Sequence, residues 1–243
     1  NRAVIEAGRL HRVSERKRLR RTLIEGPHLV GEAIRAGVTI HRTFFVPPDA
    51  DPAWPGATPV TEAVLAKLAG TEHPRGPVAV IDIPPDAPLD ADSDLLVLWQ
   101  ISDPGNVGTI IRSTAAFGLA VAIGPETADA WAPKVLRAGA GTHFGVPLTQ
   151  IDSTVDLVGY RLAATVVNGG SPPGELGPGP WAVLIGSEAH GLGPELIEQA
   201  ESRVSIPMPG GVESLNAAVA ASIVAYELGS RRRVRNGAPT GDR

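Results

Sequence analysis

Three loops in the second half of the chain hold the residue types best suited to chemistry, and each follows a short apolar segment. The first loop, residues 102–112, contains Asn106 and ends at Arg112, the only basic residue between Arg75 and Lys134. Its Asp-Pro-Gly-Asn sequence is typical of a turn. Taken alone, this loop is therefore interpreted most simply as a surface turn followed by a surface arginine.

The second loop, residues 186–193, contains three glycines and precedes a helix expected to begin at Pro194. Glycine lets a ligand approach the backbone closely, and the first turn of a helix offers unpaired N–H groups. The loop lacks both the G-x-G-x-x-G spacing and the Gly-Lys-Ser/Thr sequence, so ordinary dinucleotide or nucleoside triphosphate binding is weakly supported. His190 has no second histidine or carboxylate at ligand spacing, which indicates a loop residue rather than a metal ligand.

The third loop, residues 206–216, begins Ile-Pro-Met-Pro-Gly-Gly and is followed by an alanine-rich stretch at 217–228. The Ser214 hydroxyl would suit the N-cap of a helix in that stretch, and the small residues permit close helix packing. Capping and packing alone leave Asn216 and the Pro-Met-Pro-Gly-Gly sequence without a purpose.

Short, almost wholly apolar segments precede these loops and predict the sheet that positions them. Such strands are buried on both faces, as in a parallel sheet covered by helices. Helical patterns fall between them, which predicts an α/β domain whose ligands bind beyond the carboxyl ends of the strands. The expected strands are 95–101, 119–123, 162–167 and 181–185, and the expected helices are 107–117, 131–139, 194–201 and 215–228.

The first third of the chain also alternates helix and strand. A helix is expected at 61–69, with Thr61 as its N-cap and Gly70 as its end. A second helix is expected before it and a strand on each side of it, at 27–36, 40–46 and 77–83. The proline-rich, acidic segment that follows reads as a semi-rigid linker. The predicted division is an N-terminal domain at 1–83, a linker at 84–93 and a second domain at 94–243.

Charge is distributed unevenly along the 243 residues, whose formal net charge is −4. Residues 1–25 carry +5 and residues 226–243 carry +3, so the middle of the chain carries −12. Basic ends on an acidic chain point to a polyanionic partner, because clustered Lys and Arg gain affinity by releasing counterions. The predicted phosphate ligands are Arg16, Lys17, Arg18, Arg20 and Arg21. A solvated helical face is the competing interpretation.

The chain has no cysteine, which excludes a disulfide scaffold, a cysteine-ligated metal centre and a cysteine nucleophile. No apolar stretch approaches the length of a membrane span, and the arginine-rich start lacks the apolar region of a signal peptide. We therefore expect a cytoplasmic protein with no membrane partner.

Together, the order and spacing of the three loops resemble the motifs of the SpoU/TrmH family of S-adenosylmethionine-dependent RNA ribose 2′-O-methyltransferases. The first motif looks like residues 106–112, the second like 186–192 and the third like 206–218. Ser187 stands in the second motif where Asn is commoner in the family. The N-terminal part, through the sequences at 24–30 and 73–80, is similar to substrate-recognition domains of the ribosomal-protein L30e type.

The resemblance implies a C-terminal SPOUT domain, in which a parallel sheet carries a deep trefoil knot, and a smaller N-terminal α/β domain of the L30e type. It also implies S-adenosylmethionine as the cofactor, no metal, and a homodimer with the site at the subunit interface. The implied substrate is structured RNA, most often ribosomal, with 23S rRNA and a role in antibiotic resistance among the alternatives. The residues implied at the cofactor are Val167, Gly186, Gly191, Ile206, Met208, Leu215 and Ala218.

The resemblance further implies catalytic roles for Arg112, Asn106, Glu188, Ser214 and Asn216. An arginine is protonated at physiological pH and is a poor base. We therefore expect Arg112 to stabilise the developing alkoxide or to pair with the adjacent phosphate, with Glu188 holding it in place. The alternatives are a catalytically silent RNA-binding protein of this fold, a tRNA 2′-O-methyltransferase, and a Rossmann-type oxidoreductase, which lacks its glycine fingerprint here.

Overall fold

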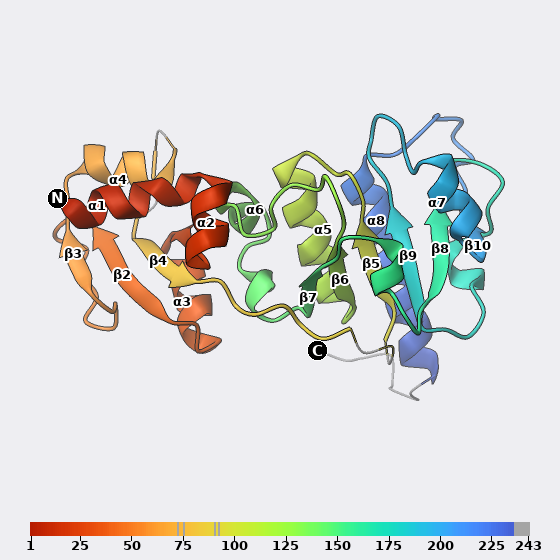
Figure 1. Cartoon of the computed structure of the whole chain (residues 1–243), viewed down its shortest axis with the longest axis horizontal. Coiled ribbons are helices and arrows are strands. Elements are labelled where there is room, and N and C mark those ends of the chain that lie inside the picture. The colour runs from red at the N-terminus through yellow and green to blue at the C-terminus, as the bar shows by residue number, and fades with distance from the viewer. Residues whose placement is uncertain (72, 75, 90, 92, 236–243) are drawn as a thin grey trace. The chain divides into compact units, whose positions relative to one another are not determined.

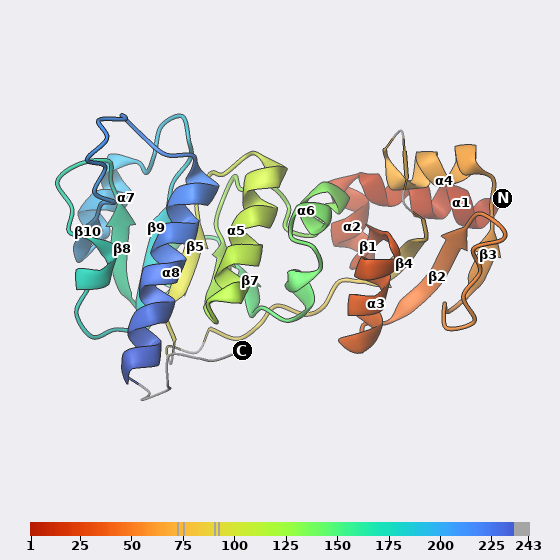
Figure 2. The ribbon, with the colours of Figure 1, turned by 180° about the vertical axis from the view of Figure 1, so that it is seen from behind.

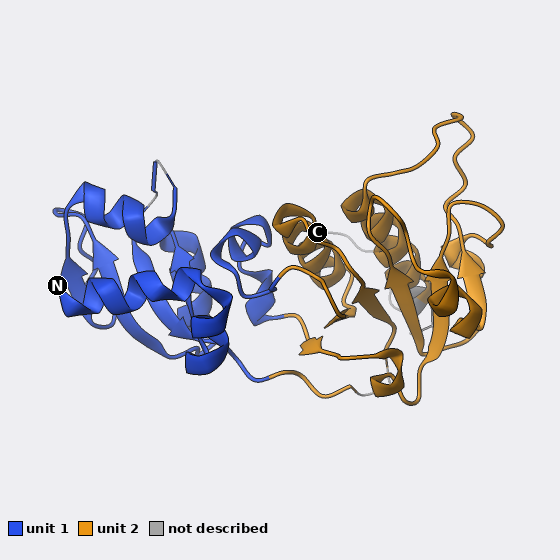
Figure 3. Ribbon diagram, turned by 45° about the horizontal axis from the view of Figure 1, so that its top comes forward, with its two compact units in different colours: residues 1–85, 129–145 blue, residues 86–128, 146–243 orange. Residues whose placement is uncertain are grey.

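A computed structural model describes residues 1–235 apart from 72, 75, 90 and 92, with side chains described to residue 231 (Figure 1). The chain forms two units. Unit 1 comprises residues 1–85 and 129–145, and unit 2 comprises residues 86–128 and 146–243 (Figure 3). No helix of the described part is long and apolar enough to cross a membrane.

Unit 1 contains a mixed four-stranded sheet in the order β1-β4-β2-β3. Strand β4 pairs antiparallel with both β1 and β2, while β3 pairs parallel with β2. Apolar side chains cover both faces of this sheet, in one cluster that includes Leu10, Leu23 and Phe44 and another that includes Ile24 and Ile81. The strands are β1 (Arg21–Glu25), β2 (Ile40–Phe45), β3 (Ala57–Pro59) and β4 (Val78–Asp82).

The helices of unit 1 include both that were predicted in this part of the chain. In α4 the Thr61 hydroxyl accepts from the Val64 N–H at 3.4 Å, and the helix ends at Gly70 in the left-handed region (φ 67°). These observations confirm the predicted cap and end. The helices of residues 1–85 are α1 (Arg2–Gly8), the 3-10 helix η1 (Arg9–His11), α2 (Val13–Leu19), α3 (Pro27–Arg35) and α4 (Glu62–Ala69).

Residues 129–145 belong to unit 1, so the units are not the two continuous stretches predicted. This segment contains α6 (Pro133–Ala138) and η2 (Thr142–Phe144), and Leu136 packs among the buried side chains around Ile24. The helix predicted at 131–139 is therefore present, but it does not cover the sheet of unit 2. Contacts with residues far away in the sequence, rather than the order of strands and helices along the chain, decide which unit this segment joins.

Unit 2 contains a wholly parallel six-stranded sheet in the order β10-β8-β9-β5-β6-β7. All four strands predicted for this part are present, and two three-residue strands, β7 and β10, were not predicted. Side chains of β5, β6 and β9 are almost all buried, as the apolar composition predicted, whereas β8 buries only Ala163 and Ala164. The strands are β5 (Leu95–Leu98), β6 (Ala120–Ile123), β7 (Leu148–Gln150), β8 (Arg161–Thr165), β9 (Trp181–Ile185) and β10 (Ser202–Val204).

Helices cover both faces of this sheet. The helices α5 (Pro104–Ala116) and α8 (Ala217–Arg235) pack against each other, and α7 (Pro194–Gln199) lies on the opposite face (Figures 1 and 2). The 3-10 helices η3 (Thr154–Asp156) and η4 (Pro173–Glu175) lie in the connections around β8. The linker predicted at 84–93 is partly attached to this unit, because the Ala87 N–H donates to the Leu148 carbonyl at 2.9 Å.

The connection between β8 and β9 contacts both β10 and α8, the last two elements of the chain. On one side, the Ser171 N–H donates to the Arg203 carbonyl, and the Ser205 N–H donates to the Ser171 carbonyl, each at 3.0 Å. On the other side, the Arg231 guanidinium of α8 donates to the Gly177 carbonyl at 2.8 Å. Residues 205–216 run from β10 to α8 across this connection, in agreement with the predicted SPOUT architecture.

Candidate active site

A cavity of about 320 Å³ lies at the carboxyl ends of β8, β9 and β10 in unit 2. This is the edge of a parallel sheet where ligands bind, and the volume is within the range of small-molecule sites. Six residues predicted at the cofactor line it, namely Val167, Gly186, Gly191, Ile206, Met208 and Leu215. The structure thus brings the second and third predicted loops together around one cavity.

Ala218 was also predicted at the cofactor, but it does not line the cavity. It is a buried residue in the first turn of α8, whereas the lining residues of that helix are Ala217 and Ala220. These two positions are three residues apart and share one face of the helix. Ala218 thus lies one position away from the lining face, and its contact with the cofactor stays a prediction.

Close backbone approach explains the glycines of the second loop. A Cβ atom on Gly186 would lie 2.3 Å from the carbonyl carbon of Gly191, so only glycine fits there. The loop closes through two hydrogen bonds, from the Ser187 N–H to the Gly191 carbonyl at 3.2 Å and from the Gly191 N–H to the Ser187 carbonyl at 2.9 Å. The two glycines thus bring backbone groups to this wall of the cavity, beside the side chains of Glu188 and His190.

Three of the predicted catalytic residues form one hydrogen-bond network that links all three loops. The Asn106 amide donates to a Glu188 carboxylate oxygen, and the Asn216 amide donates to the Asn106 side-chain oxygen at 3.1 Å. Asp103 caps α5 by accepting from the Asn106 N–H at 2.9 Å, which fixes the start of that helix. Glu188 also lines the cavity, so the network extends from α5 to the cavity wall.

Asn216, not Ser214, caps α8. Its side-chain oxygen accepts from the N–H groups of Ala218 at 2.9 Å and Val219 at 3.2 Å. An asparagine at this position satisfies orphan donors of the first turn. Ser214 instead lines the cavity with its side chain exposed. Asn216 therefore serves two purposes, since the same side chain caps the helix and orients Asn106.

The Arg112 side chain is exposed on α5 and makes no hydrogen bond or ion pair with another residue of the described part. The expected bond from the Arg112 guanidinium to Glu188 is absent from the described contacts, and the Glu188 carboxylate accepts from Asn106 instead. Arg112 does not line the cavity either. Its guanidinium is thus available to a ligand outside the cavity.

Sequence reasoning missed several lining residues, among them Thr165, His190 and Val204. Thr165 and Val204 are the last residues of β8 and β10, so the rule that sites lie beyond strand ends could have found them. His190 was interpreted as a loop residue. It lies on that loop and lines the cavity, with its N–H donating to the Ser187 hydroxyl at 3.3 Å.

The residues present fit a small ligand that combines a positive charge with flat and apolar parts. The walls are aliphatic side chains and glycine backbone, and Glu188 places a carboxylate at the edge. Among the residues that the structure describes, no group of three or more His, Asp or Glu side chains could hold a metal ion. S-adenosylmethionine, with its sulfonium and adenosine, matches this donor set.

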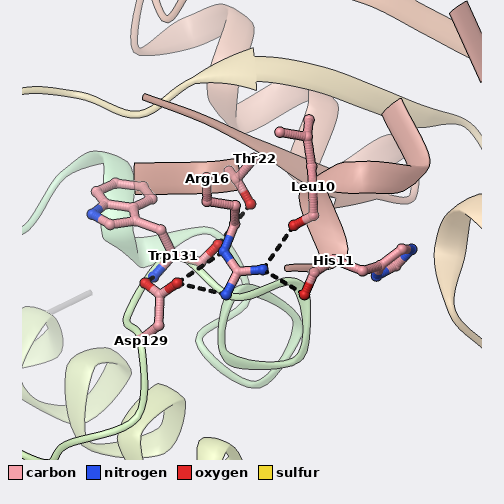
Figure 4. Close-up of polar contacts among 6 residues, drawn as sticks. All are labelled: Leu10, His11, Arg16, Thr22, Asp129 and Trp131. Carbon is pink, nitrogen blue, oxygen red and sulfur yellow. Dashed lines mark hydrogen bonds and ion pairs between the residues drawn. The ribbon is translucent and has the colours of Figure 1, made fainter. Parts of the chain in front are cut away.

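The five predicted RNA-phosphate ligands divide into two kinds, and Figure 4 shows the contacts of Arg16, the one that is buried. Arg16 is 2% exposed, and its guanidinium donates to Asp129 at 2.6 and 2.8 Å and to the carbonyls of Leu10 and His11. It cannot reach a phosphate without breaking these bonds, so its assignment to RNA binding is corrected. Lys17, Arg18 and Arg20 are exposed, and Arg21 is half-buried beside Asp82.

Comparison with known proteins identifies relatives of both parts of the chain. The model of the SpoU rRNA Methylase family matches residues 94–226, and the model of the MRM3-like substrate binding domain matches residues 1–79. The 23S rRNA (guanosine(2553)-2′-O)-methyltransferase RlmP of Bacillus subtilis is 32% identical over 94% of this chain and 96% of its own.

Solved structures resemble the whole described fold. The SpoU methyltransferase AviRb of Streptomyces viridochromogenes was solved in complex with AdoMet. It matches with a TM-score of 0.85 and 25% identity, and the match covers 96% of this chain and 98% of AviRb. An AdoMet-bound rRNA methyltransferase of Sinorhizobium meliloti has a TM-score of 0.84 at 26% identity, over 96% of this chain and 95% of its own.

Proposed function

This chain belongs to the SpoU rRNA methylase family, and from that premise we propose that it methylates a ribose 2′-hydroxyl of 23S ribosomal RNA. The chain is an S-adenosylmethionine-dependent RNA 2′-O-ribose methyltransferase. The choice of 23S rRNA rests on the RlmP relative, whose similarity extends over both units. The observation that carries the assignment of the site is the cavity that the second and third loops enclose beside the network of Asn106, Glu188 and Asn216.

We assign the cofactor to the cavity at the carboxyl ends of β8, β9 and β10. Bound there, S-adenosylmethionine supplies a methyl group already activated by its sulfonium, so no metal is needed for the transfer. Glycine backbone at Gly186 and Gly191 can bind the polar edges of the ligand, and Ile206 and Leu215 can pack against its flat parts. The Glu188 carboxylate favours a cationic ligand by electrostatic attraction.

The reaction joins the ribose 2′-oxygen to the methyl carbon, breaks the bond from that carbon to sulfur, and releases the hydroxyl proton. Arg112 remains protonated at neutral pH, so we assign its free guanidinium to the developing alkoxide or to the adjacent phosphate rather than to proton removal. The Asn106 and Asn216 amides orient the groups around it. Holding oxygen and methyl in line is the larger part of the catalysis.

We further propose a homodimer formed through α5 and α8. Val219 and Tyr226 on α8 are 48% and 54% exposed, and the Tyr226 ring packs edge-on against Phe117 at the end of α5. Exposed large apolar side chains along one helix are typical of an interface. Light scattering of wild type and Tyr226→Arg checks this proposal. We expect a dimeric wild type and a monomeric variant, and a monomeric wild type would contradict it.

Because ribosomal RNA is the proposed substrate, we place the protein in the cytoplasm.

Transfer of labelled methyl groups to isolated 23S, 16S and tRNA fractions tests the substrate. We expect label in 23S rRNA alone, at a 2′-O-methylated ribose that primer extension at low nucleotide concentration can map. Label confined to tRNA would support the tRNA methyltransferase alternative. Calorimetric titration with S-adenosylmethionine separates both from a silent RNA-binding protein, which need not bind cofactor.

A further inference from the structure

A groove of about 360 Å³ in unit 1 is lined by an excess of cationic side chains. Its floor is the apolar core, where Leu10 and Phe44 are almost completely buried. Two acids, Glu6 and Glu15, also line it. The basic residues of this groove come from η1, α2, β1 and β2, and they are Arg9, Arg18, Arg21, His41 and Arg42.

Each acid around the groove already has a cationic partner. Glu6 is paired with Arg2 at 2.7 Å, and Glu15 with Arg18 at 2.8 Å. Asp82, next to the groove, accepts from Arg21 at 3.2 Å and contacts the His41 ring at 2.5 Å. These pairs are solvent-exposed or half-exposed, so rearranging them costs little free energy.

Two arginines of the groove form no ion pair or hydrogen bond with an acid of the described residues, although both, after the hydrogen bond from Arg2, help to lower the pKa of Glu6 by electrostatic attraction. Arg42 donates to a neutral acceptor, the Thr58 hydroxyl, at 3.0 Å. The Arg9 side chain makes no hydrogen bond or ion pair with any residue that the structure describes. A guanidinium offers a planar set of donors that matches a phosphate. Both are therefore ready to bind an anion without giving up an existing ion pair.

The groove is better suited to the phosphate backbone of a nucleic acid than to an unpaired base. Its one phenyl ring, that of Phe44, is fully buried, and the His41 ring is held against the Asp82 carboxylate, so the groove offers little surface for stacking an unpaired base. Cations on several elements suit a series of phosphates held in fixed positions, as in a helical RNA segment, which proteins recognise by shape and phosphate contacts. The segment of the chain that matches a substrate-binding domain, residues 1–79, includes every basic residue of this groove.

We propose that this groove binds the phosphate backbone of a helical RNA segment, with Arg9 and Arg42 as its principal ligands and Arg18 and Arg21 beside them. Neither Arg9 nor Arg42 is close in sequence to the other, so no charge run marks the site. The proposal rests on the proposed function for the identity of the RNA. The residues that would bind the RNA backbone are therefore separate from those assigned to catalysis.

The test compares two double variants of the full chain that remove the same charge. Arg9→Gln/Arg42→Gln alters the groove, whereas Arg35→Gln/Lys67→Gln alters exposed positions on α3 and α4 of the same unit. The probes are a fluorescein-labelled RNA hairpin with a two-turn stem and an oligouridine of equal length. Fluorescence anisotropy over a range of KCl concentrations gives the Kd and its salt dependence, and circular dichroism verifies folding.

For the groove variant we expect the Kd for the hairpin to rise at least about tenfold and the slope of log Kd against log salt to fall by about 2, since each lost phosphate contact removes about one unit. The matched variant should bind like wild type. Equal Kd values and slopes for both variants would overturn the proposal. A loss confined to oligouridine would overturn the assignment to helical RNA. With fluorescein-labelled polyglutamate as a third probe, a loss confined to that probe would assign the groove to an acidic protein instead.

Methyl transfer distinguishes this proposal from the proposed function. With saturating RNA, the groove variant should keep the wild-type kcat while its KM rises, because the altered residues do not touch the reacting atoms. If no RNA fraction accepts methyl groups, the proposed function fails, yet the difference in hairpin binding between the two variants still decides whether the groove binds RNA.

Discussion

Unit 1 buries charge, whereas the interior of unit 2 is almost wholly apolar. The charged or titratable side chains that are buried in the described structure, Arg16 and His143, both belong to unit 1. In unit 2 the buried polar side chains are the threonines Thr114 and Thr149. Layers of helix and sheet hold unit 2 together and leave its polar groups at the strand ends. Unit 1 depends instead on specific pairings with the segment 129–145.

The largest expected effect follows from breaking the buried ion pair of unit 1. Arg16→Met leaves the Asp129 carboxylate without its partner, and we expect the free energy of unfolding of unit 1 to fall by about 3–5 kcal/mol. Hydrogen exchange read by mass spectrometry on peptides from 1–85 and 129–145 measures this. The double variant Arg16→Met/Asp129→Leu should recover most of the loss. A loss below about 1 kcal/mol would show that the pair does not hold the segment.

A comparable effect, on catalysis rather than stability, is expected in unit 2. Arg112→Ala should lower the single-turnover rate of methyl transfer by about 10²–10³, the usual cost of removing a group that stabilises the transition state. The Kd for S-adenosylmethionine should stay unchanged, because Arg112 does not line the cavity. Arg203→Ala, an exposed arginine of the same unit, is the control. Full activity of Arg112→Ala would remove Arg112 from the mechanism.

The sequence predicts unit 2 better than unit 1, because apolar strands carry a local signal and long-range pairings do not. The strands of unit 2 could be predicted because apolar runs such as 181–185 carry their own signal. The strands β7 and β10, of three residues each, are too short to show a pattern. The attachment of 129–145 to unit 1 could not be predicted, because the bond from Arg16 to Asp129 joins residues 113 positions apart.

The candidate site was predicted more completely than the unit boundaries. The motifs located the cavity and its network, since Gly186, Glu188 and Asn216 lie on loops that the sheet brings together. Two details differ from the expectation: Ala218 lies one position away from the residues of α8 that line the cavity, and Asn216 takes the capping role expected of Ser214. Such details depend on the exact start of α8, which propensities do not fix.

His143 should make unit 1 sensitive to acid in a way that unit 2 is not. Burial lowers the pKa of His143 to about 4, the Ala130 backbone opposing this only in part, and its ring packs against Trp131 with centroids 5.7 Å apart. The folded state therefore holds the neutral ring while the unfolded state takes up a proton below about pH 6.5. Stability is present above that pH and is lost as the pH falls toward 4, by about 3 kcal/mol in total.

Urea unfolding of wild type and His143→Leu at pH 7 and pH 4.5 measures this contribution. The free energy of unfolding of wild type should fall more over this interval than that of His143→Leu, because the variant has no proton to take up at this position. The carboxylates titrate equally in both proteins, so their contributions to the free energy of unfolding cancel in the difference. Parallel pH profiles would contradict the assignment.

The smallest expected effect separates the two purposes of Asn216. Asn216→Asp keeps the oxygen that caps α8 but removes the donor to Asn106, so we expect kcat to fall about tenfold, or about 1.4 kcal/mol, with stability unchanged. Asn216→Ala removes both and should also destabilise α8 by about 1 kcal/mol. Steady-state kinetics and thermal melting of the two variants are the measurements. Equal activity of Asn216→Asp and wild type would reduce the network to a structural role.

The membership of 129–145 in unit 1 sets an order of events during synthesis. Domains generally fold as units as the chain emerges from the ribosome. Unit 1 opens the chain, yet it cannot be completed until residue 145 has been made, because Asp129 and Leu136 supply contacts that Arg16 and Ile24 require. The first 85 residues must therefore wait, incompletely packed, while the first strands of unit 2 are already being translated.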